Sequence, residues 1–445
     1  MFVIDEAHTI EQHGRDFRPE FKEALHNMRD VIASMDERIP ILAMSATYRK
    51  KDRKTVANCL GIDKPNALMR GPLARRNVLF RLDVTGDPTH AMKSATEQDL
   101  AGDPTGQQIW YTNTKSNAEG RLLDIANDIL DREESKRGIV GDDGFQTVAM
   151  SLTGGDGIMQ KVLAMDSFTN YANIDDEGYV EMDGDKVKLV KLQIMPATSA
   201  TNCGVNSKWC KVSRHRGLPP NLYDVVQEMG RVDRMLNALP GTNVYVVHLC
   251  FYSVVGLFVR VMKTTDDAER QRQVDAMMEV LRFLLSPTEC YHSFIERYFE
   301  EGDAGEKVGC GSFCSFCNGD MQELTGLFRR RRLMSVLSTD IFGQGRKAPK
   351  AREFVKALKL KKEFFFHENH VPKTNMGPIH ALCLQLLGRG IIGLHSSDSS
   401  KIGTDKFDEN DVVVRLLDAV DESDPDQCLH PAYTLNERWN GMTFS

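Results

Sequence analysis

The stretch that decides the fold is "FVIDEAHT", residues 2–9. A short apolar run, Phe2 to Ile4, stops at two adjacent carboxylates, Asp5 and Glu6, and His8 follows shortly after them. An apolar run of this kind is typical of a buried strand. The paired acids fit either an ordinary strand-to-loop exit or a metal–nucleotide site, so the neighbouring segments have to decide between the two.

The composition is that of a soluble globular chain, and 445 residues are enough for two or three domains. No stretch approaches the roughly 18 apolar residues of a membrane helix, and no secretory signal precedes the first strand. We therefore expect an intracellular protein without membrane contact. The net charge of −7 argues against nucleic-acid binding by the whole surface. The basic runs 328–333 and 346–364 fit either a solvated face or a phosphate contact, and 173–185 is acidic.

Strand and helix patterns alternate along the first 250 residues, which predicts an α/β fold with parallel sheets. Strands are predicted at 2–4, 38–47, 107–114, 145–153, 190–198, 210–217 and 242–249. Helices are predicted at 19–35, 53–62, 115–130, 157–168 and 222–234, with a linker near 65–105. Residues 170–190 predict an inserted β-hairpin. Residues 263–300 read as helical, 377–394 as a helix followed by a strand, and 396–411 as a loop.

Several segments place charged, aromatic or thiol side chains at the ends of these elements. Beside the octapeptide they are "IEQHGRDFRPEF" (10–21), "SAT" (45–47), "ATSATNCGVNSKWC" (197–210), "HRGLPPNLYDVVQEMGRVDR" (215–234) and four cysteines between 290 and 317. Together these segments resemble superfamily 2 helicases, specifically the RecQ family. The letters DEAH at residues 5–8 match the DEAH box of such enzymes.

The resemblance implies an ATP and Mg²⁺ site at the first strand. In the family the Asp holds Mg²⁺ on the phosphates and the Glu polarises the attacking water, which gives these roles to Asp5 and Glu6. His8 would link the nucleotide to the DNA-bound state. Ser45 and Thr47 match the motif that couples nucleotide to movement, so they are expected near the nucleotide as well.

The segment 10–21 resembles the aromatic-rich loop of RecQ helicases. The resemblance implies contact with single-stranded DNA through the following side chains: Gln12, His13, Arg15, Phe17 and Arg18. His13 stands where the family usually has Trp. Because Trp stacks better on a base, a contact worth about 1–3 kcal/mol, the coupling to DNA is expected to be weaker here.

In the second α/β unit, the resemblance implies nucleotide contacts by Gln227, Gly230, Arg231 and Arg234. A guanidinium can stabilise the charge that develops on the transferred phosphoryl group. Arg234 is the first choice for this arginine finger and Arg231 the second. A continuous helix over 222–234 would put both on one face. Segment 197–210 matches its motif imperfectly, with Asn202 and Cys203 in place of the usual Phe-Gly pair.

Four cysteines, Cys290, Cys310, Cys314 and Cys317, resemble the RecQ zinc module, in which one cysteine on a helix precedes a cluster of three. Four thiolates satisfy tetrahedral Zn²⁺ in a closed structural site. The spacing departs from the family pattern, because three residues rather than two separate Cys310 from Cys314. Buried free thiols are the alternative.

The resemblance implies two RecA-like parallel-sheet domains, the first incomplete, followed by a helical zinc-binding module and a mixed α/β region. The expected boundaries are 1–75, 76–250, 251–330 and 331–445. The last segment would hold a basic linker and a candidate winged-helix-like region. The basic run at 346–362 suggests the nucleus.

The resemblance thus implies an ATP-dependent 3′→5′ DNA helicase of DNA repair and recombination, acting on single-stranded and forked or branched duplex DNA. No G-x-x-x-x-G-K-[ST] sequence occurs in the chain, although family members carry this phosphate-binding loop ahead of the DEAH box. Two explanations stay open: truncation before that loop, which would leave this portion inactive alone, and an ATPase-inactive paralogue that binds nucleic acid or serves as a scaffold.

Overall fold

The described part of the chain divides into two compact units in the computed structural model. The first comprises Met1–Arg76 with Glu289–Cys310, and the second comprises Asn77–Thr288 with Gly311–Ser445. The residues described are 1–7, 23, 27–31, 34, 39–45, 47, 49–62, 75, 77–136, 147–171, 173–175, 178–182, 185–199, 205, 207–232, 243–285, 289–300, 310–311, 313–318, 330–366, 372, 376–388 and 390–417.

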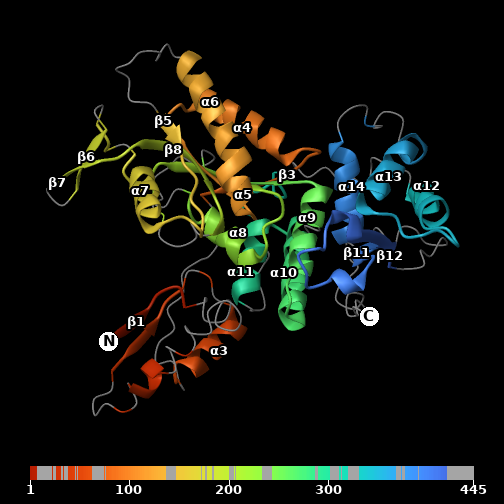
Figure 1. The fold of residues 1–445 in the computed structure, drawn as a ribbon, viewed down its shortest axis with the longest axis horizontal. Helices are drawn as coiled ribbons and strands as arrows, with labels where there is room; N and C mark the ends of the chain where they lie inside the picture. The colour runs from red at the N-terminus through yellow and green to blue at the C-terminus, as the bar shows by residue number, and fades with distance from the viewer. Residues whose placement is uncertain are drawn as a thin grey trace. The chain divides into compact units, whose positions relative to one another are not determined.

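The first unit contains two short parallel strands and a helix packed against them (Figure 1). β1 (Phe2–Ile4) pairs with β2 (Ile41–Ala43), and α3 (Lys50–Cys59) contributes Val56 to the core beside them. The chain leaves α3 through Gly61 at φ +67°, a left-handed conformation that glycine adopts without a Cβ clash.

A second helix, α11 (Tyr291–Glu300), belongs to the same unit. Arg49 donates a hydrogen bond of 2.8 Å to the Tyr298 hydroxyl, and Arg53 donates one of 3.3 Å to the carbonyl of Phe299. The residues at the start of α3 are therefore tied to the helix that follows Cys290.

The second unit is built on a six-stranded sheet in which all neighbouring strands run parallel (Figure 1). The order across the sheet is β3-β10-β9-β4-β8-β5. In that order the strands are Leu79–Val84, Val244–Leu249, Cys210–Arg216, Gln107–Thr112, Lys191–Ala197 and Thr147–Ala149. The predicted α/β class with a parallel sheet is confirmed.

Both faces of this sheet are covered, and strand β4 shows how the sequence achieves it. Trp110 packs on one face against α4 (Pro88–Gly102) and α6 (Leu123–Lys136). Its neighbours Ile109 and Tyr111 point to the opposite face, where α7 (Ile158–Thr169) supplies further apolar residues. Every residue of β4 is buried, as expected for a central strand of a doubly covered parallel sheet.

Further elements complete the second unit. Between β4 and α6 lie α5 (Lys115–Asn117) and the π-helical turn η1 (Ala118–Leu122). An antiparallel hairpin precedes β8, with strands β6 (Tyr179–Met182) and β7 (Asp185–Lys188). The other helices are α8 (Leu222–Met229), α9 (Phe251–Met262), α10 (Asp267–Leu285), α12 (Arg330–Ser335), η4 (Val336–Ile341), α13 (Ala351–Phe365) and α14 (Gly377–Gly388). β11 (Ile392–Ser396) and β12 (Val412–Leu416) pair antiparallel, with short 3₁₀ turns η6 (Ser399–Lys401) and η7 (Glu409–Asp411) between them.

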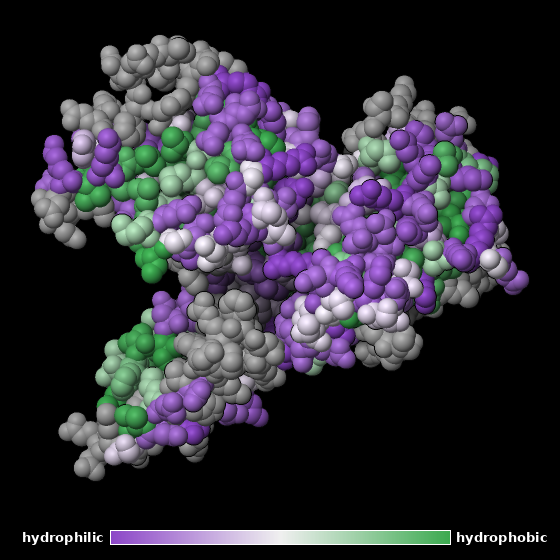
Figure 2. Space-filling model, viewed as in Figure 1, coloured by the Kyte–Doolittle hydropathy of each residue, from purple (hydrophilic) through white to green (hydrophobic). Residues whose placement is uncertain are grey.

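The surface is polar over most of the face in Figure 2, with local apolar areas. At the start of α7, Ile158 and Met159 are 81% and 82% exposed. In the first unit, Val3 and Leu42 are register partners on neighbouring strands, and both are exposed. None of the helices in the described ranges has the length and apolar character needed to cross a membrane.

The structure corrects three expectations about secondary structure. The predicted linker at 65–105 is wrong over its second half, which forms β3 and α4. The predicted helix 222–234 ends at Met229, with Gly230 at its C-cap. α9 lies between the last predicted strand and the predicted helical segment, where no element was expected. The inserted hairpin at 170–190 is present, although its turn at 183–184 lies outside the described residues.

Candidate functional site

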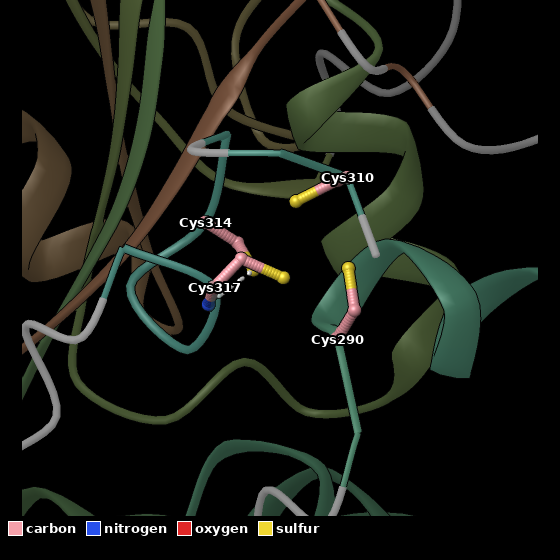
Figure 3. Close-up of side chains that lie close together, drawn as sticks. All are labelled: Cys290, Cys310, Cys314 and Cys317. Carbon is pink, nitrogen blue, oxygen red and sulfur yellow. Dashed lines mark hydrogen bonds between the residues drawn. The ribbon is translucent and has the colours of Figure 1, made fainter. Parts of the chain in front are cut away.

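The four predicted zinc ligands lie together. The sulfur atoms of Cys290, Cys310, Cys314 and Cys317 are all within 4.8 Å of one another, and Figure 3 shows them converging on a common centre. Cys290 directly precedes α11, and Cys314 and Cys317 lie on one tight turn. Three of the thiols are buried and Cys317 is half-buried.

The donor set fits zinc. Four thiolates bound tetrahedrally at about 2.3 Å place their sulfur atoms about 3.8 Å apart, and the sulfur atoms here lie within 4.8 Å of one another. The backbone N–H of Cys317 donates to the Cys314 sulfur at 3.4 Å, a contact that favours the thiolate form. Because all four positions are protein thiols, the site is closed and has no coordination position for a substrate.

The turn that carries two of these ligands is attached to the edge of the parallel sheet. The N–H of Phe80 in β3 donates to the carbonyl of Phe313 at 3.0 Å, and the N–H of Ser315 donates to the carbonyl of Phe80 at 2.9 Å. The Phe80 ring is buried against Tyr245 and Phe283, with both ring centroids at 5.3 Å. The turn thus occupies the side of β3 that faces away from β10.

The paired acids at the end of β1 lie beside the Ser45–Thr47 segment. The N–H of Ala7 donates to the carbonyl of Met44 at 2.8 Å, so the two strand exits run side by side. The N–H of Glu6 donates to a carboxylate oxygen of Asp5 at 2.8 Å, and Glu6 itself has φ +50°. Left-handed backbone is unfavourable for a residue with a Cβ, and such strain is concentrated at functional sites.

The serine and threonine of this segment are locally ordered. Ser45 Oγ accepts from the N–H of Thr47 at 3.1 Å and donates to its carbonyl at 2.9 Å. Thr47 is 1% exposed, and its hydroxyl has no hydrogen-bond partner among the residues that the structure describes. Two carboxylates and a buried hydroxyl without a partner are a donor set that fits Mg²⁺ and phosphate oxygens.

In the second unit, Gln227 and Gly230 lie at the end of α8, and Arg231 follows them in a turn rather than in the helix. The structure therefore gives no support to a shared helix face for Arg231 and Arg234. Arg231 is 4% exposed and donates a hydrogen bond of 2.9 Å to the carbonyl of Val205. This contact ties the turn to segment 197–210.

Next to Gln227, Glu228 is the centre of a buried polar network. It accepts hydrogen bonds from His215 Nδ1 at 2.9 Å and from the Tyr245 hydroxyl at 2.8 Å. Burial and the Glu228 charge together raise the pKa of Tyr245 well above its usual value. Glu228 therefore links α8 to strands β9 and β10.

The remaining predicted site residues lie outside the described part of the chain. They are His8, Gln12, His13, Arg15, Phe17, Arg18 and Arg234. Their assigned roles stay predictions.

Sequence reasoning missed a second buried network across the sheet. Arg214 on β9 donates to His248 Nε2 at 3.2 Å, and His248 Nδ1 lies 2.8 Å from a carboxylate oxygen of Asp83. Arg214 also forms an ion pair with Asp99 of α4. Burial, with Arg214 adding to it, lowers the pKa of His248. The members come from distant strands, so no local sequence signal could have joined them.

The cysteine cluster coincides with a known domain. The RecQ zinc-binding domain matches residues 255–318, a segment that includes all four cysteines.

Sequence relatives extend this match along most of the chain. ATP-dependent DNA helicase RecQ of Pasteurella multocida is 22% identical over 335 residues, which cover 75% of this chain and 44% of that protein. ATP-dependent DNA helicase RecQ of Bacillus subtilis is 23% identical over 314 residues, covering 70% and 44%. The chain spans less than half the length of these two relatives.

Among solved structures, Mycobacterium smegmatis helicase Lhr bound to ssDNA and AMP-PNP has a TM-score of 0.40 at 14% identity. That match covers 67% of this chain and 36% of the Lhr chain. The chain is thus similar to RecQ-type helicases through the zinc-binding match and through distant sequence relatives, and its four cysteines lie within the matched RecQ zinc-binding segment.

Proposed function

We propose that this protein acts as an ATP-dependent 3′→5′ DNA helicase of RecQ type in DNA repair and recombination. The observation that carries the proposal is the four-cysteine cluster, because it lies within the matched RecQ domain of a chain whose curated relatives are ATP-dependent DNA helicases. Single-stranded and forked or branched duplex DNA would be the substrates. The basic run at 346–362 supports a nuclear location.

ATP and Mg²⁺ would be held at the exits of β1 and β2. In this proposal Asp5 binds the metal ion, and Glu6 accepts a proton from the attacking water. Both carboxylates have to lie at the strand end to reach the metal ion and the water. Ser45 and Thr47 would report the state of the nucleotide to the rest of the unit, because their segment is hydrogen-bonded to the residue that follows Glu6. His8 would connect this site to DNA.

Two arginines are candidates for stabilising the phosphoryl charge. The buried contact between Arg231 and the carbonyl of Val205 supports a structural part for Arg231 and leaves Arg234 as the proposed finger. In a longer protein that carries a phosphate-binding loop, Arg234→Ala should lower ATP turnover by about 10³-fold or more with folding unchanged. Arg231→Ala should instead lower thermal stability. If Arg231→Ala folds normally and loses turnover while Arg234→Ala keeps it, the assignment is reversed.

The proposed contacts with single-stranded DNA are Gln12, His13, Arg15, Phe17 and Arg18. His13→Trp should strengthen binding of a fluorescent single-stranded oligonucleotide, because the larger ring system stacks better on a base, by about 1 kcal/mol or more. His13→Ala, which removes the ring, is the matched control. An equal affinity for all three proteins would remove His13 from the DNA site.

The test of the whole proposal is strand separation on a forked duplex, measured with the natural protein at its full length in the presence of Mg²⁺ and ATP. Glu6→Gln should abolish unwinding while nucleotide binding persists. Glu23→Gln is the matched control, since Glu23 is an exposed acid of the same unit. DNA binding without nucleotide-dependent unwinding in the wild-type protein would favour the alternative, an ATPase-inactive binding or scaffold protein.

A further inference from the structure

A cavity in the second unit is lined by none of the four cysteines and by none of the residues assigned to ATP or DNA. It has a volume of about 630 Å³, is open to solvent and is lined by four segments: the turn between β3 and α4, α9, α13 and the start of α14. Its size lies within the range of small-molecule sites, about 300–1,000 Å³. At its wall Gly86 packs so closely on Met376 that a Cβ at Gly86 would lie 3.1 Å from the Met376 side chain.

The charge that faces this cavity is positive. Lys356 and Lys359 of α13 both line it, three residues apart and therefore on one side of the helix. Neither makes an ion pair with any described residue. The one acidic residue of the lining, Asp87, is already engaged as the N-cap of α4, where its carboxylate accepts from the N–H groups of Thr89 and His90 at 2.9 and 3.2 Å.

Two helices begin at the cavity. α4 starts directly after Asp87, and α14 starts directly after Met376, and both of these residues line the space. The N-terminal end of a helix carries a partial positive charge that favours anions. The N-terminus of α4 is already capped by the Asp87 carboxylate. The N-terminus of α14 and the two lysines therefore act in the same direction on whatever occupies the cavity.

A buried histidine packs at the wall of the cavity. His380 lies in the first turn of α14, lines the cavity and is 3% exposed, and its Nδ1 has no hydrogen-bond partner among the described residues. Its ring packs edge-on against Tyr252 at 5.0 Å between centroids, which fixes its orientation. A buried polar atom without a partner costs free energy unless a ligand, water or rearrangement satisfies it.

We propose that this cavity is a binding site for a small phosphate-bearing ligand, with Lys356 and Lys359 as its charged contacts and His380 as a positioning group. A phosphate offers several acceptor oxygens and a charge of about −1.5 to −2, which matches two ammonium groups and the N-terminus of α14. The site is independent of the proposed helicase chemistry, because it uses none of the residues assigned to ATP, DNA or zinc.

The binding test uses inorganic pyrophosphate as the probe, with the affinity measured by calorimetry at low ionic strength. The wild-type protein should bind it, and Lys356→Ala/Lys359→Ala should weaken binding by at least about tenfold, as expected for the loss of charge-assisted contacts. Lys361→Ala/Lys406→Ala is the matched control, because it removes the same charge from lysines of the C-terminal region that do not line the cavity. Equal weakening in both double variants, or no binding to the wild-type protein, would overturn the proposal.

A second readout locates the ligand. With ¹³C-labelled histidine, the His380 ring resonance, assigned by its loss in His380→Gln, should shift when pyrophosphate is added to the wild-type protein and stay fixed in the Lys356→Ala/Lys359→Ala variant. A single-stranded oligonucleotide serves as the competing source of phosphate. If it displaces pyrophosphate and produces the same His380 shift, the cavity receives a nucleic-acid backbone and the proposed free ligand is wrong.

Discussion

Glu6 has the only positive φ among the non-glycine residues that the structure describes. If this conformation is strained, glycine at the same position should relieve it. We expect Glu6→Gly to be more stable than Glu6→Ala by about 1 kcal/mol, because both variants lose the side chain and only alanine retains the Cβ in a left-handed backbone. Chemical unfolding of the two variants measures the difference. A Glu6→Ala protein as stable as Glu6→Gly would contradict the strained turn.

His380 predicts how stability depends on pH. Burial lowers the pKa of His380 to about 4, whereas an unfolded chain would have a value near 6.5. The unfolded state therefore takes up the proton first as the pH falls. The stabilisation by the neutral ring is complete above about pH 6.5 and is lost between pH 6.5 and 4.

We expect His380→Gln to flatten the pH dependence of the free energy of unfolding in this window by about 1–2 kcal/mol, after allowance for solvent screening. The measurement is a urea titration at several pH values between 7 and 4. His90→Gln is the control, since His90 lines the same cavity but is exposed. If the free energy of unfolding depends on pH in both variants as it does in the wild-type protein, His380 does not cause the loss of stability between pH 6.5 and 4.

At the level of single elements, the cysteine turn and strand β3 form one structural feature. Removing zinc should therefore affect the sheet edge and not only the turn. We expect Cys314→Ala to lose the metal, to lower the free energy of unfolding by more than about 3 kcal/mol, and to expose the Phe80 and Ser315 amides to hydrogen exchange. Cys383→Ala, which changes a buried cysteine outside the cluster, should retain one zinc and lose only about 1 kcal/mol.

Two outcomes would contradict this coupling. Metal analysis that finds no zinc in the wild-type protein would remove the ion from the site. Full retention of zinc in Cys314→Ala would remove Cys314 from the ligand set, whatever the hydrogen exchange of β3 shows.

The sequence predicts most strands because they are short, apolar and bounded by turns. β9 was predicted as a strand in spite of its mixed sequence, "CKVSRHR". Arg214 and His215 are buried there with partners from other elements, which the sequence did not predict. β3 lies in the segment predicted as a linker, although the alternation of its apolar residues with Arg81 and Asp83 is itself typical of a strand. Local patterns do not reveal partners that lie elsewhere in the chain.

The candidate sites also differ in how far the sequence predicts them. Cys310, Cys314 and Cys317 are close in sequence, so their grouping could be predicted, and Cys290 followed from the family resemblance. The end of helix α8 was not predicted correctly, because "EMGRVDR" continues a helical pattern through Gly230. The phosphate cavity has no sequence signal, since its lining comes from four separate segments.

At the scale of the whole molecule, the proposed ATP hydrolysis would need a phosphate-binding loop, and no G-x-x-x-x-G-K-[ST] sequence occurs in residues 1–445. Residues 1–445 should show no DNA-stimulated ATP hydrolysis, because a helicase cradles the phosphates with a glycine-rich loop and a lysine of the form G-x-x-x-x-G-K-[ST]. Phosphate release by the wild-type chain should equal that of Glu6→Gln, with and without single-stranded DNA. Turnover that Glu6→Gln abolishes would mean that another loop binds the phosphates.

The attachment of β3 also has a consequence for how the protein is made. Asp83 on β3 contacts His248 on the neighbouring strand, 165 residues further along, and Leu82 contacts Ser315, 233 residues further along. At about 5–20 residues per second, a ribosome needs on the order of 10 s to supply the first partner and longer to supply the second. During that interval "LFRLDV" leaves the exit tunnel with neither edge paired. The nascent chain therefore exposes a strand to chaperones and to other chains until synthesis has passed the cysteine turn.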